Sequence, residues 1–129
     1  DNAPCAGVIL ACQRVLAAGG RNYIITHRGS ASLMALLDWY RVGGLFADFV
    51  TRDDGFPRKP DPAAFNAVID RHGLCRDEVL VVGDRKLDVL AGQAAGVHTC
   101  LFAEQPVPEV TPDHLIARFD ELSAVLGLV

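Results

Sequence analysis

Four polar side chains occupy places in the sequence from which a folded sheet could gather them around an anion. Thr26 ends an apolar run, 23–26, and its hydroxyl stands beside the N–H groups that begin the next helix, a combination that can bind an anion. Lys59 supplies one compact positive charge in an Arg-Lys-Pro-Asp-Pro segment. Asp84 and Asp88 follow another apolar run and lie about one helical turn apart. These residue types predict a site for an anion and a divalent cation.

The two aspartates carry the strongest of these signals. Two carboxylates about 4 Å apart repel each other by about 4 kcal/mol at an effective dielectric constant of about 20. A Mg²⁺ ion would remove that repulsion, because it binds one or two carboxylates together with water and phosphate oxygens. Simpler roles also fit each residue taken singly. Thr26 can be satisfied by its own turn, Lys59 by solvent, and the two acids can cap a helix.

Apolar periodicity and the positions of glycine and proline predict helices that alternate with short strands. Asp61-Pro62 is a strong helix start, with a carboxylate cap and proline at the first helical position. Val79 to Val82 form a continuous apolar run, typical of a strand covered on both faces. Helices are expected over 5–18, from Ser30 or Ser32 to Tyr40, over 61–72, between Asp84 and Gly96, and from Thr111 to Leu126, and strands over 23–26, 46–51, 79–82 and 97–102.

This alternation predicts an α/β fold with a doubly wound parallel sheet, in which ligands bind beyond the carboxyl ends of the strands. The length of 129 residues fits one domain over residues 1–129. A net charge of −4 without a basic cluster argues against nucleic acid as a partner, and no apolar run is long enough to span a membrane. Four widely spaced cysteines in apolar settings predict small buried side chains in a reducing cytoplasm: Cys5, Cys12, Cys75 and Cys100.

In this order and spacing, the polar residues resemble the motifs of the haloacid dehalogenase (HAD) superfamily of phosphohydrolases. Thr26, in IITHR, resembles the hydroxyl residue of the second motif, and Lys59, in RKPDP, the lysine of the third. The segment VVGDRKLDVLAGQAAGV, with Asp84 and Asp88, resembles the fourth. The resemblance extends over residues 4–103 and is nearest to the branch of phosphoglycolate phosphatase-like and β-phosphoglucomutase-like proteins.

The resemblance implies a HAD-like Rossmannoid core that removes phosphate from a small phosphorylated metabolite with Mg²⁺. In the family, an aspartate attacks phosphorus to give an aspartyl-phosphate, and a second aspartate two residues on acts as general acid and base. The roles implied here are phosphate binding by Thr26, His27, Arg28 and Lys59, catalysis by Thr26, Lys59 and Asp84, direct Mg²⁺ ligation by Asp84, and indirect or water-mediated ligation by Asp88.

The family's first motif is missing, because no two acidic residues in this sequence are separated by one residue. Asp53 and Asp54 are adjacent, so their carboxylates are expected to point in opposite directions. The substrate-selecting cap is missing as well. We therefore expect the central nucleophile strand of the sheet to come from upstream sequence, from a separate segment or from another protomer. Direct pairing of the strands at 23–26 and 79–83 is the alternative.

Three other functions stay open or compete. One is a non-catalytic domain that keeps the phosphate and Mg²⁺ ligands, and a second is a phosphomutase or phosphotransferase of the same family. A phospho-acceptor signalling domain suits the RKPDP segment poorly. Dinucleotide binding is excluded because no G-x-G-x-x-G follows a strand.

Overall fold

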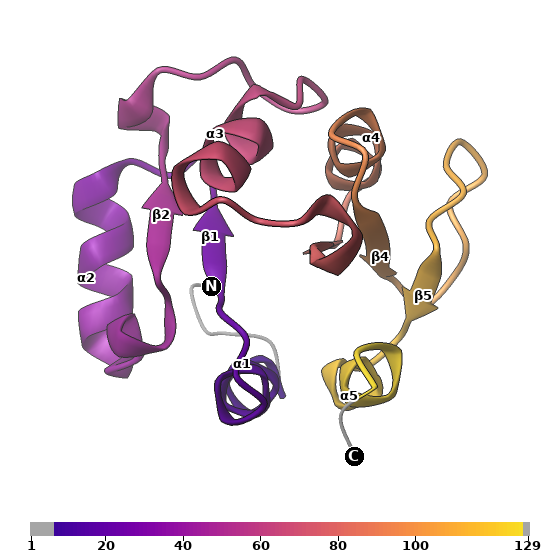
Figure 1. The fold of residues 1–129 in the computed structure, drawn as a ribbon, viewed down its shortest axis with the longest axis horizontal. Coiled ribbons are helices and arrows are strands. Elements are labelled where there is room, and N and C mark those ends of the chain that lie inside the picture. The colour runs from indigo at the N-terminus through magenta and orange to yellow at the C-terminus, as the bar shows by residue number, and fades with distance from the viewer. Residues whose placement is uncertain (1–6, 128–129) are drawn as a thin grey trace. The chain divides into compact units, whose positions relative to one another are not determined.

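The computed structural model describes residues 7–127 and divides the chain into two compact units (Figure 1). The first unit contains the chain up to Gly55 and again from Arg118, and the second contains Phe56–Ala117. The expectation of one domain over 1–129 stays a prediction. Within residues 7–127, no helix combines the length and the apolar character needed to cross a bilayer.

The first unit is built on a two-stranded parallel sheet, in which β1 pairs with β2. Helix α1 contacts α5 near the chain's end, and α2 contacts the 3₁₀ turn η1. Its elements are α1 (Val8–Ala17), β1 (Tyr23–Ile25), α2 (Ser30–Tyr40), η1 (Gly43–Leu45), β2 (Asp48–Val50), the 3₁₀ turns η2 (Arg52–Asp54) and η4 (Phe119–Glu121), and α5 (Leu122–Val125).

The second unit contains a three-stranded parallel sheet in the order β3-β4-β5, with helix α4 packed on β3 and β4. Val89 of α4, Leu101 of β4 and Val110 form a buried apolar cluster. Gly92 permits the close packing of α4, because a Cβ there would lie 2.8 Å from Thr99 Cγ2. The elements are α3 (Ala63–His72), the 3₁₀ turn η3 (Arg76–Glu78), β3 (Leu80–Gly83), α4 (Lys86–Ala94), β4 (His98–Phe102) and β5 (His114–Ile116).

The predicted α/β class with parallel strands is confirmed, since all three strand pairings are parallel. Several boundaries also agree, including the end of α3 at Gly73, which has φ +60°. The carboxylate of Asp61 accepts a hydrogen bond from the Ala63 N–H at 2.9 Å, as expected of a cap. The second strand is shorter than the predicted 46–51, because residues 46, 47 and 51 lie outside β2. Residues 5 and 6 of the first predicted helix lie outside the described residues.

The helix predicted from Thr111 to Leu126 is wrong. Its first part is β5, and only Leu122–Val125 forms an α-helix. The spacing of Leu115, Phe119 and Leu122 imitates a helical stripe, but Leu115 is 40% exposed in the strand. The segment forms a strand despite this local pattern, because β5 pairs in parallel with the buried strand β4, beginning at Cys100↔His114.

Two burial expectations also fail. The strand at 79–82 was expected to be covered on both faces, yet all four residues of β3 are only half-buried. β3 pairs with β4 along one edge, and in residues 7–127 its other edge has no ladder partner. Of the cysteines, Cys100 is buried, Cys12 is half-buried with a thiol pKa raised by burial, Cys75 is exposed, and Cys5 lies outside the described residues.

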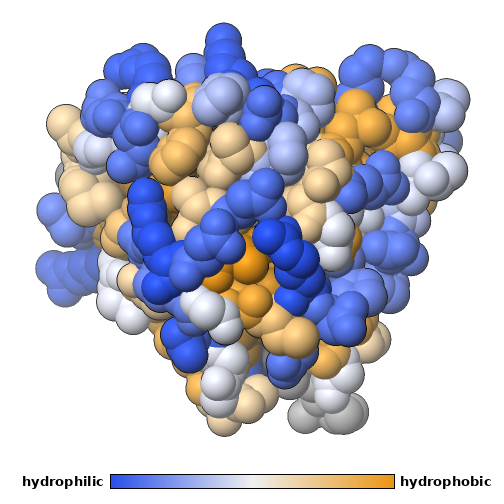
Figure 2. All heavy atoms as spheres, turned by 45° about the horizontal axis from the view of Figure 1, so that its top comes forward, coloured by the Kyte–Doolittle hydropathy of each residue, from blue (hydrophilic) through white to orange (hydrophobic). Residues whose placement is uncertain are grey.

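Apolar side chains also reach the surface. Figure 2 shows orange hydrophobic areas between blue hydrophilic ones on one face. Among residues 7–127, the most exposed large apolar side chain is Trp39 of α2, with 81% of its surface accessible.

Asp113 fastens β5 to β4, and its loss should destabilise the fold. Its carboxylate accepts hydrogen bonds from the N–H of Thr99 at 2.9 Å and from the Thr99 hydroxyl at 3.3 Å, and Thr99 is fully buried. Asp113→Ala leaves these two buried donors without an acceptor, so we expect the free energy of unfolding to fall by about 1–3 kcal/mol. Urea titration measures this, with the exposed Asp70→Ala as control. Equal losses in the two variants would contradict the assignment.

Candidate functional site

The carboxyl end of β3 positions both aspartates of the predicted fourth motif. Gly83 ends the strand, exposed Asp84 follows it, and Asp88 lies in the first turn of α4. Asp88 is 7% exposed, and its Oδ2 accepts a hydrogen bond from the N–H of Arg85 at 3.3 Å. One carboxylate therefore faces solvent at the strand end, while the other is buried and hydrogen-bonded.

Lys59 reaches Asp88 across 29 residues of sequence. Its Nζ lies 2.6 Å from Asp88 Oδ1, and the side chains are 25% and 10% exposed. The ammonium also lies 5.8 Å from the ring centroid of Phe65. This charge-assisted hydrogen bond has little access to solvent, so it is stronger than an ordinary surface ion pair. The structure thus brings together two of the residues singled out from the sequence.

The fit of these residues to Mg²⁺ differs between the two acids. Both oxygens of Asp88 already accept hydrogen bonds, from Lys59 and from Arg85. Among residues 7–127, by contrast, no hydrogen bond or ion pair of the Asp84 side chain competes for a cation. Among residues 7–127, no group of three or more His, Cys, Asp or Glu side chains is placed to hold a metal. Mg²⁺ needs only one or two carboxylates when water and phosphate complete its shell, so Asp84 fits the ion directly and Asp88 fits it indirectly.

Thr26 follows β1 in the first unit and begins a tightly hydrogen-bonded loop. Its N–H donates to the Val50 carbonyl at 2.9 Å, and its Oγ1 accepts from the Arg28 N–H at 3.1 Å. The N–H of Ser30, the first residue of α2, donates to Asp53 at 2.7 Å. The anion-binding corner expected from these amides is thus partly occupied by the protein itself. Convergence of Thr26 with Lys59 and Asp84, which belong to the other unit, stays a prediction.

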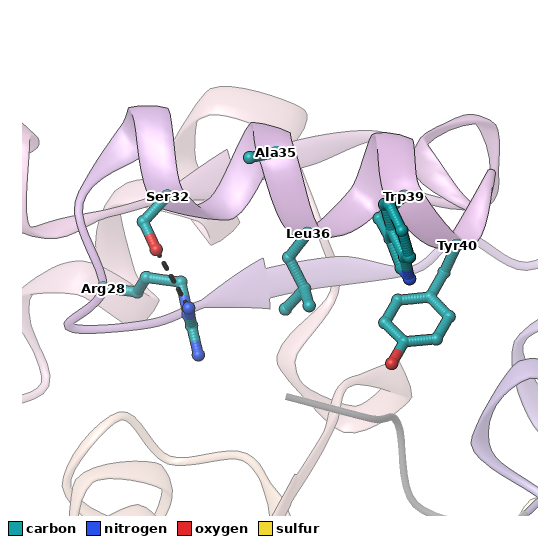
Figure 3. Close-up of a pocket in the computed structure, with 6 residues that line it drawn as sticks. All are labelled: Arg28, Ser32, Ala35, Leu36, Trp39 and Tyr40. Atoms are coloured by element: carbon teal, nitrogen blue, oxygen red, sulfur yellow. Dashed lines mark hydrogen bonds between the residues drawn. The ribbon is translucent and has the colours of Figure 1, made fainter. Parts of the chain in front are cut away.

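His27 and Arg28 also lie in this loop, His27 exposed and Arg28 half-buried. The Arg28 guanidinium donates to Ser32 Oγ at 2.9 Å (Figure 3). Arg28 and Ser32 lie at one end of a pocket of about 340 Å³ along α2. The pocket is lined by Arg28, Ser32, Ala35, Leu36, Trp39 and Tyr40. The sequence predicted Ser30 or Ser32 as the start of this helix, but neither serine caps it. Gly29 occupies the N-cap position, the Ser30 hydroxyl pairs with Thr51, and the Ser32 hydroxyl accepts from Arg28.

Comparison with known proteins decides the family. The family model of haloacid dehalogenase-like hydrolases matches residues 2–102. The chain belongs to the haloacid dehalogenase-like hydrolase family. It is 33% identical over 110 residues to a phosphoglycolate phosphatase of Aliivibrio fischeri, a match that covers 81% of this chain and 48% of that enzyme. It is 32% identical over 92 residues to the pyrophosphatase PpaX of Bacillus velezensis, which covers 67% of this chain and 43% of the relative.

The fold of this chain agrees with solved structures of the family. It matches the HAD hydrolase YfnB of Bacillus subtilis, solved with magnesium bound, at 29% identity and a TM-score of 0.84. The match covers 95% of this chain and 55% of the other. The chain spans about half the length of the curated relatives it matches.

Gly83 has a packing role that the sequence did not reveal. The structure shows a close approach there, because a Cβ on Gly83 would lie 2.4 Å from the Cβ, Cγ and Oδ2 atoms of Asp88. Gly83→Ala should displace Asp88 from Lys59 and lower the free energy of unfolding by about 1–3 kcal/mol. Urea titration checks this against Gly44→Ala, where a Cβ meets nothing within 4 Å. A similar cost in both variants would contradict the steric argument.

Sequence reasoning missed a hydrogen-bond network around the turn that follows β2. Asp53 Oδ2 accepts from the Ser30 N–H, and the Ser30 and Thr51 hydroxyls lie 2.7 Å apart. Asp54 instead accepts from the Thr51 N–H at 2.7 Å, so the two adjacent carboxylates serve different partners, as expected. Thr-Arg-Asp-Asp-Gly directly after a strand is the signal that could have indicated a capped turn.

The Asp53 contact predicts a pH dependence of stability. The hydrogen bonds from Ser30, together with the charge of Arg52, hold the pKa of Asp53 below its ordinary value of 3.8. A lowered native pKa contributes stability that is present above the unfolded-state pKa and is lost as the pH falls through the native pKa. The difference in unfolding free energy between wild type and Asp53→Asn should therefore be constant above about pH 5 and shrink below about pH 4. Urea titrations across this range measure it, and a difference independent of pH would contradict it.

Proposed function

We propose that the chain forms most of the core domain of a phosphatase that removes phosphate from a small phosphorylated metabolite through an aspartyl-phosphate. The observation that carries the proposal is the ion pair between half-buried Lys59 and buried Asp88 at the carboxyl end of β3, beside the exposed carboxylate of Asp84. Membership of the HAD-like hydrolase family and the phosphatase names of several relatives support it.

Each candidate residue has a distinct role in this proposal. The Thr26 hydroxyl and the loop with His27 and Arg28 bind the phosphoryl oxygens. Lys59, held by Asp88, balances the charge between the nucleophile and the phosphate. Asp84 holds Mg²⁺ directly and Asp88 supports that site indirectly, and the ion, when bound, orients the phosphate and neutralises developing charge.

The nucleophile and the central strand come from outside these 129 residues in this proposal. β1 pairs only with β2, and β3 pairs along one edge with β4, so within the described chain each of these apolar strands keeps one edge without a ladder partner. Open apolar edges with neither proline nor charge are rare in stable domains, because their backbone groups must be satisfied. Upstream sequence, a separate segment or another protomer supplies the strand, and the length of the relatives favours upstream sequence.

The proposal is tested by joining this chain to the part of the Aliivibrio fischeri enzyme that it does not match. We expect hydrolysis of p-nitrophenyl phosphate that requires Mg²⁺ and stops with a chelator, and no turnover by the 129-residue chain alone. A panel with 2-phosphoglycolate and pyrophosphate, the substrates named for two relatives, then ranks the metabolites. Turnover by the short chain, or a folded chimera without activity, would overturn the proposal.

A second candidate is a non-catalytic domain that binds phosphate and Mg²⁺. The lack of two acidic residues separated by one residue favours it. Calorimetry that shows Mg²⁺-dependent binding of inorganic phosphate, together with an inactive chimera, would support this candidate over the first. A phosphomutase or phosphotransferase would instead pass the phosphoryl group to an acceptor other than water, which product analysis distinguishes.

A further inference from the structure

We propose that the turn after β2 clamps the candidate phosphate-binding loop, and that Asp53 is a positioning residue for that loop. This inference rests on the proposed function, because the loop, residues 26–30, is the part of the first unit that would hold phosphate. Asp53 has no place in the HAD motifs, and its contact with the loop spans 23 residues of sequence.

The turn is a rigid base for such a clamp. The Thr51 N–H donates to Asp54 Oδ2 at 2.7 Å, and Thr51 Oγ1 accepts from the Asp53 N–H at 3.3 Å. Gly55 closes the turn with φ +76°, and its N–H donates to the Arg52 carbonyl at 3.2 Å. Thr51 is only 6% exposed, so its hydroxyl is shielded from competing water. The Asp53 carboxylate therefore projects from a backbone that is fixed on both sides.

Three contacts join this turn to the loop. The Asp53 carboxylate accepts from the Ser30 N–H at 2.7 Å, the Thr51 and Ser30 hydroxyls lie 2.7 Å apart, and the Arg52 N–H donates to the Arg28 carbonyl at 3.1 Å. They fall on both sides of Gly29, where a Cβ would lie 2.8 Å from Arg52 Nη2. Gly29, the N-cap of α2, has no side chain to cap the helix, so Asp53 satisfies the first helical N–H from a distant turn.

The contacts continue to the candidate phosphate ligand. The Arg28 N–H donates to Thr26 Oγ1, so the direction of the Thr26 hydroxyl depends on the backbone position of Arg28, and the turn holds the Arg28 carbonyl on the other side of its Cα. Releasing Asp53 frees the Ser30 end of the loop and, through it, the Thr26 hydroxyl. A negative charge so near an anion site is unfavourable by itself, and its use as a hydrogen-bond acceptor for the helix end offsets that cost.

Hydrogen exchange of the chain tests the clamp without any turnover. We expect the Ser30 amide to exchange at least tenfold faster in Asp53→Ala than in wild type. In Asp53→Asn, which keeps an acceptor oxygen, the increase should be threefold or less. Asp38→Asn, an exposed acid of α2, is the control and should leave the Ser30 rate unchanged. Equal rates in wild type and Asp53→Ala would overturn the clamp.

Kinetics of the chimera then test the positioning role, at a temperature where circular dichroism shows every variant folded. We expect kcat/KM to fall at least tenfold in Asp53→Ala and to recover to within about threefold of wild type in Asp53→Asn. Equal values for Ala and Asn would mean that charge alone matters, and an unchanged value in Asp53→Ala would mean a merely structural contact; either overturns the role. If wild type itself is inactive, the proposed function fails, while hydrogen exchange still decides the clamp.

Discussion

Replacing Asp84 with asparagine should lower kcat/KM of the chimera at least about 100-fold and leave the fold intact. The side chain is exposed at the end of β3, and it makes no hydrogen bond or ion pair with the part of the chain that the structure describes. We therefore expect the free energy of unfolding to stay within about 0.5 kcal/mol of wild type. Activity should fall because an amide oxygen without charge is a much weaker Mg²⁺ ligand than a carboxylate.

Asp77→Asn is the matched control for this prediction, since Asp77 is an exposed acid of η3 in the same unit. It should change neither activity nor stability. A second readout is the concentration of Mg²⁺ that gives half-maximal activity, which should rise at least tenfold in Asp84→Asn and not in the control. Full activity of Asp84→Asn, at an unchanged Mg²⁺ requirement, would remove Asp84 from the proposed metal site.

How much of this fold could be predicted depended on how local the signals were. The alternation of helices and strands is encoded in short segments, and it could be predicted from them. Motifs after two strands singled out Lys59 and Asp88 for one site, but their direct ion pair was not predicted. β5 was missed because its burial depends on the exposed edge of β4 rather than on its own periodicity. The Asp53 contact was missed for the same reason, since it joins residues of two separate strand ends. Half-burial of β3 reflects an edge without a partner, which no local pattern encodes.

The Lys59–Asp88 pair should show a reversal of sign in a double-mutant cycle. Lys59→Met leaves the 10% exposed Asp88 carboxylate without its cation, so we expect a loss of about 3 kcal/mol in the free energy of unfolding. Asp88→Asn leaves a lysine that is 25% exposed and can turn toward water, so its cost should be smaller, about 1–2 kcal/mol. In the Lys59→Met background, however, Asp88→Asn removes an unpaired buried charge and should raise stability.

This reversal separates the ion pair from a general packing effect. If Lys59 and Asp88 contributed only by filling space, the two losses would add in the double variant, as they do for independent sites. Urea titration of the four chains measures the coupling, and simple additivity would contradict the pair as the structure shows it. The recovery of stability in the double variant should not restore its catalytic activity. The chimera with both substitutions should regain part of its stability and remain at least about 100-fold less active, because neither methionine nor asparagine can balance the charge of a phosphoryl group.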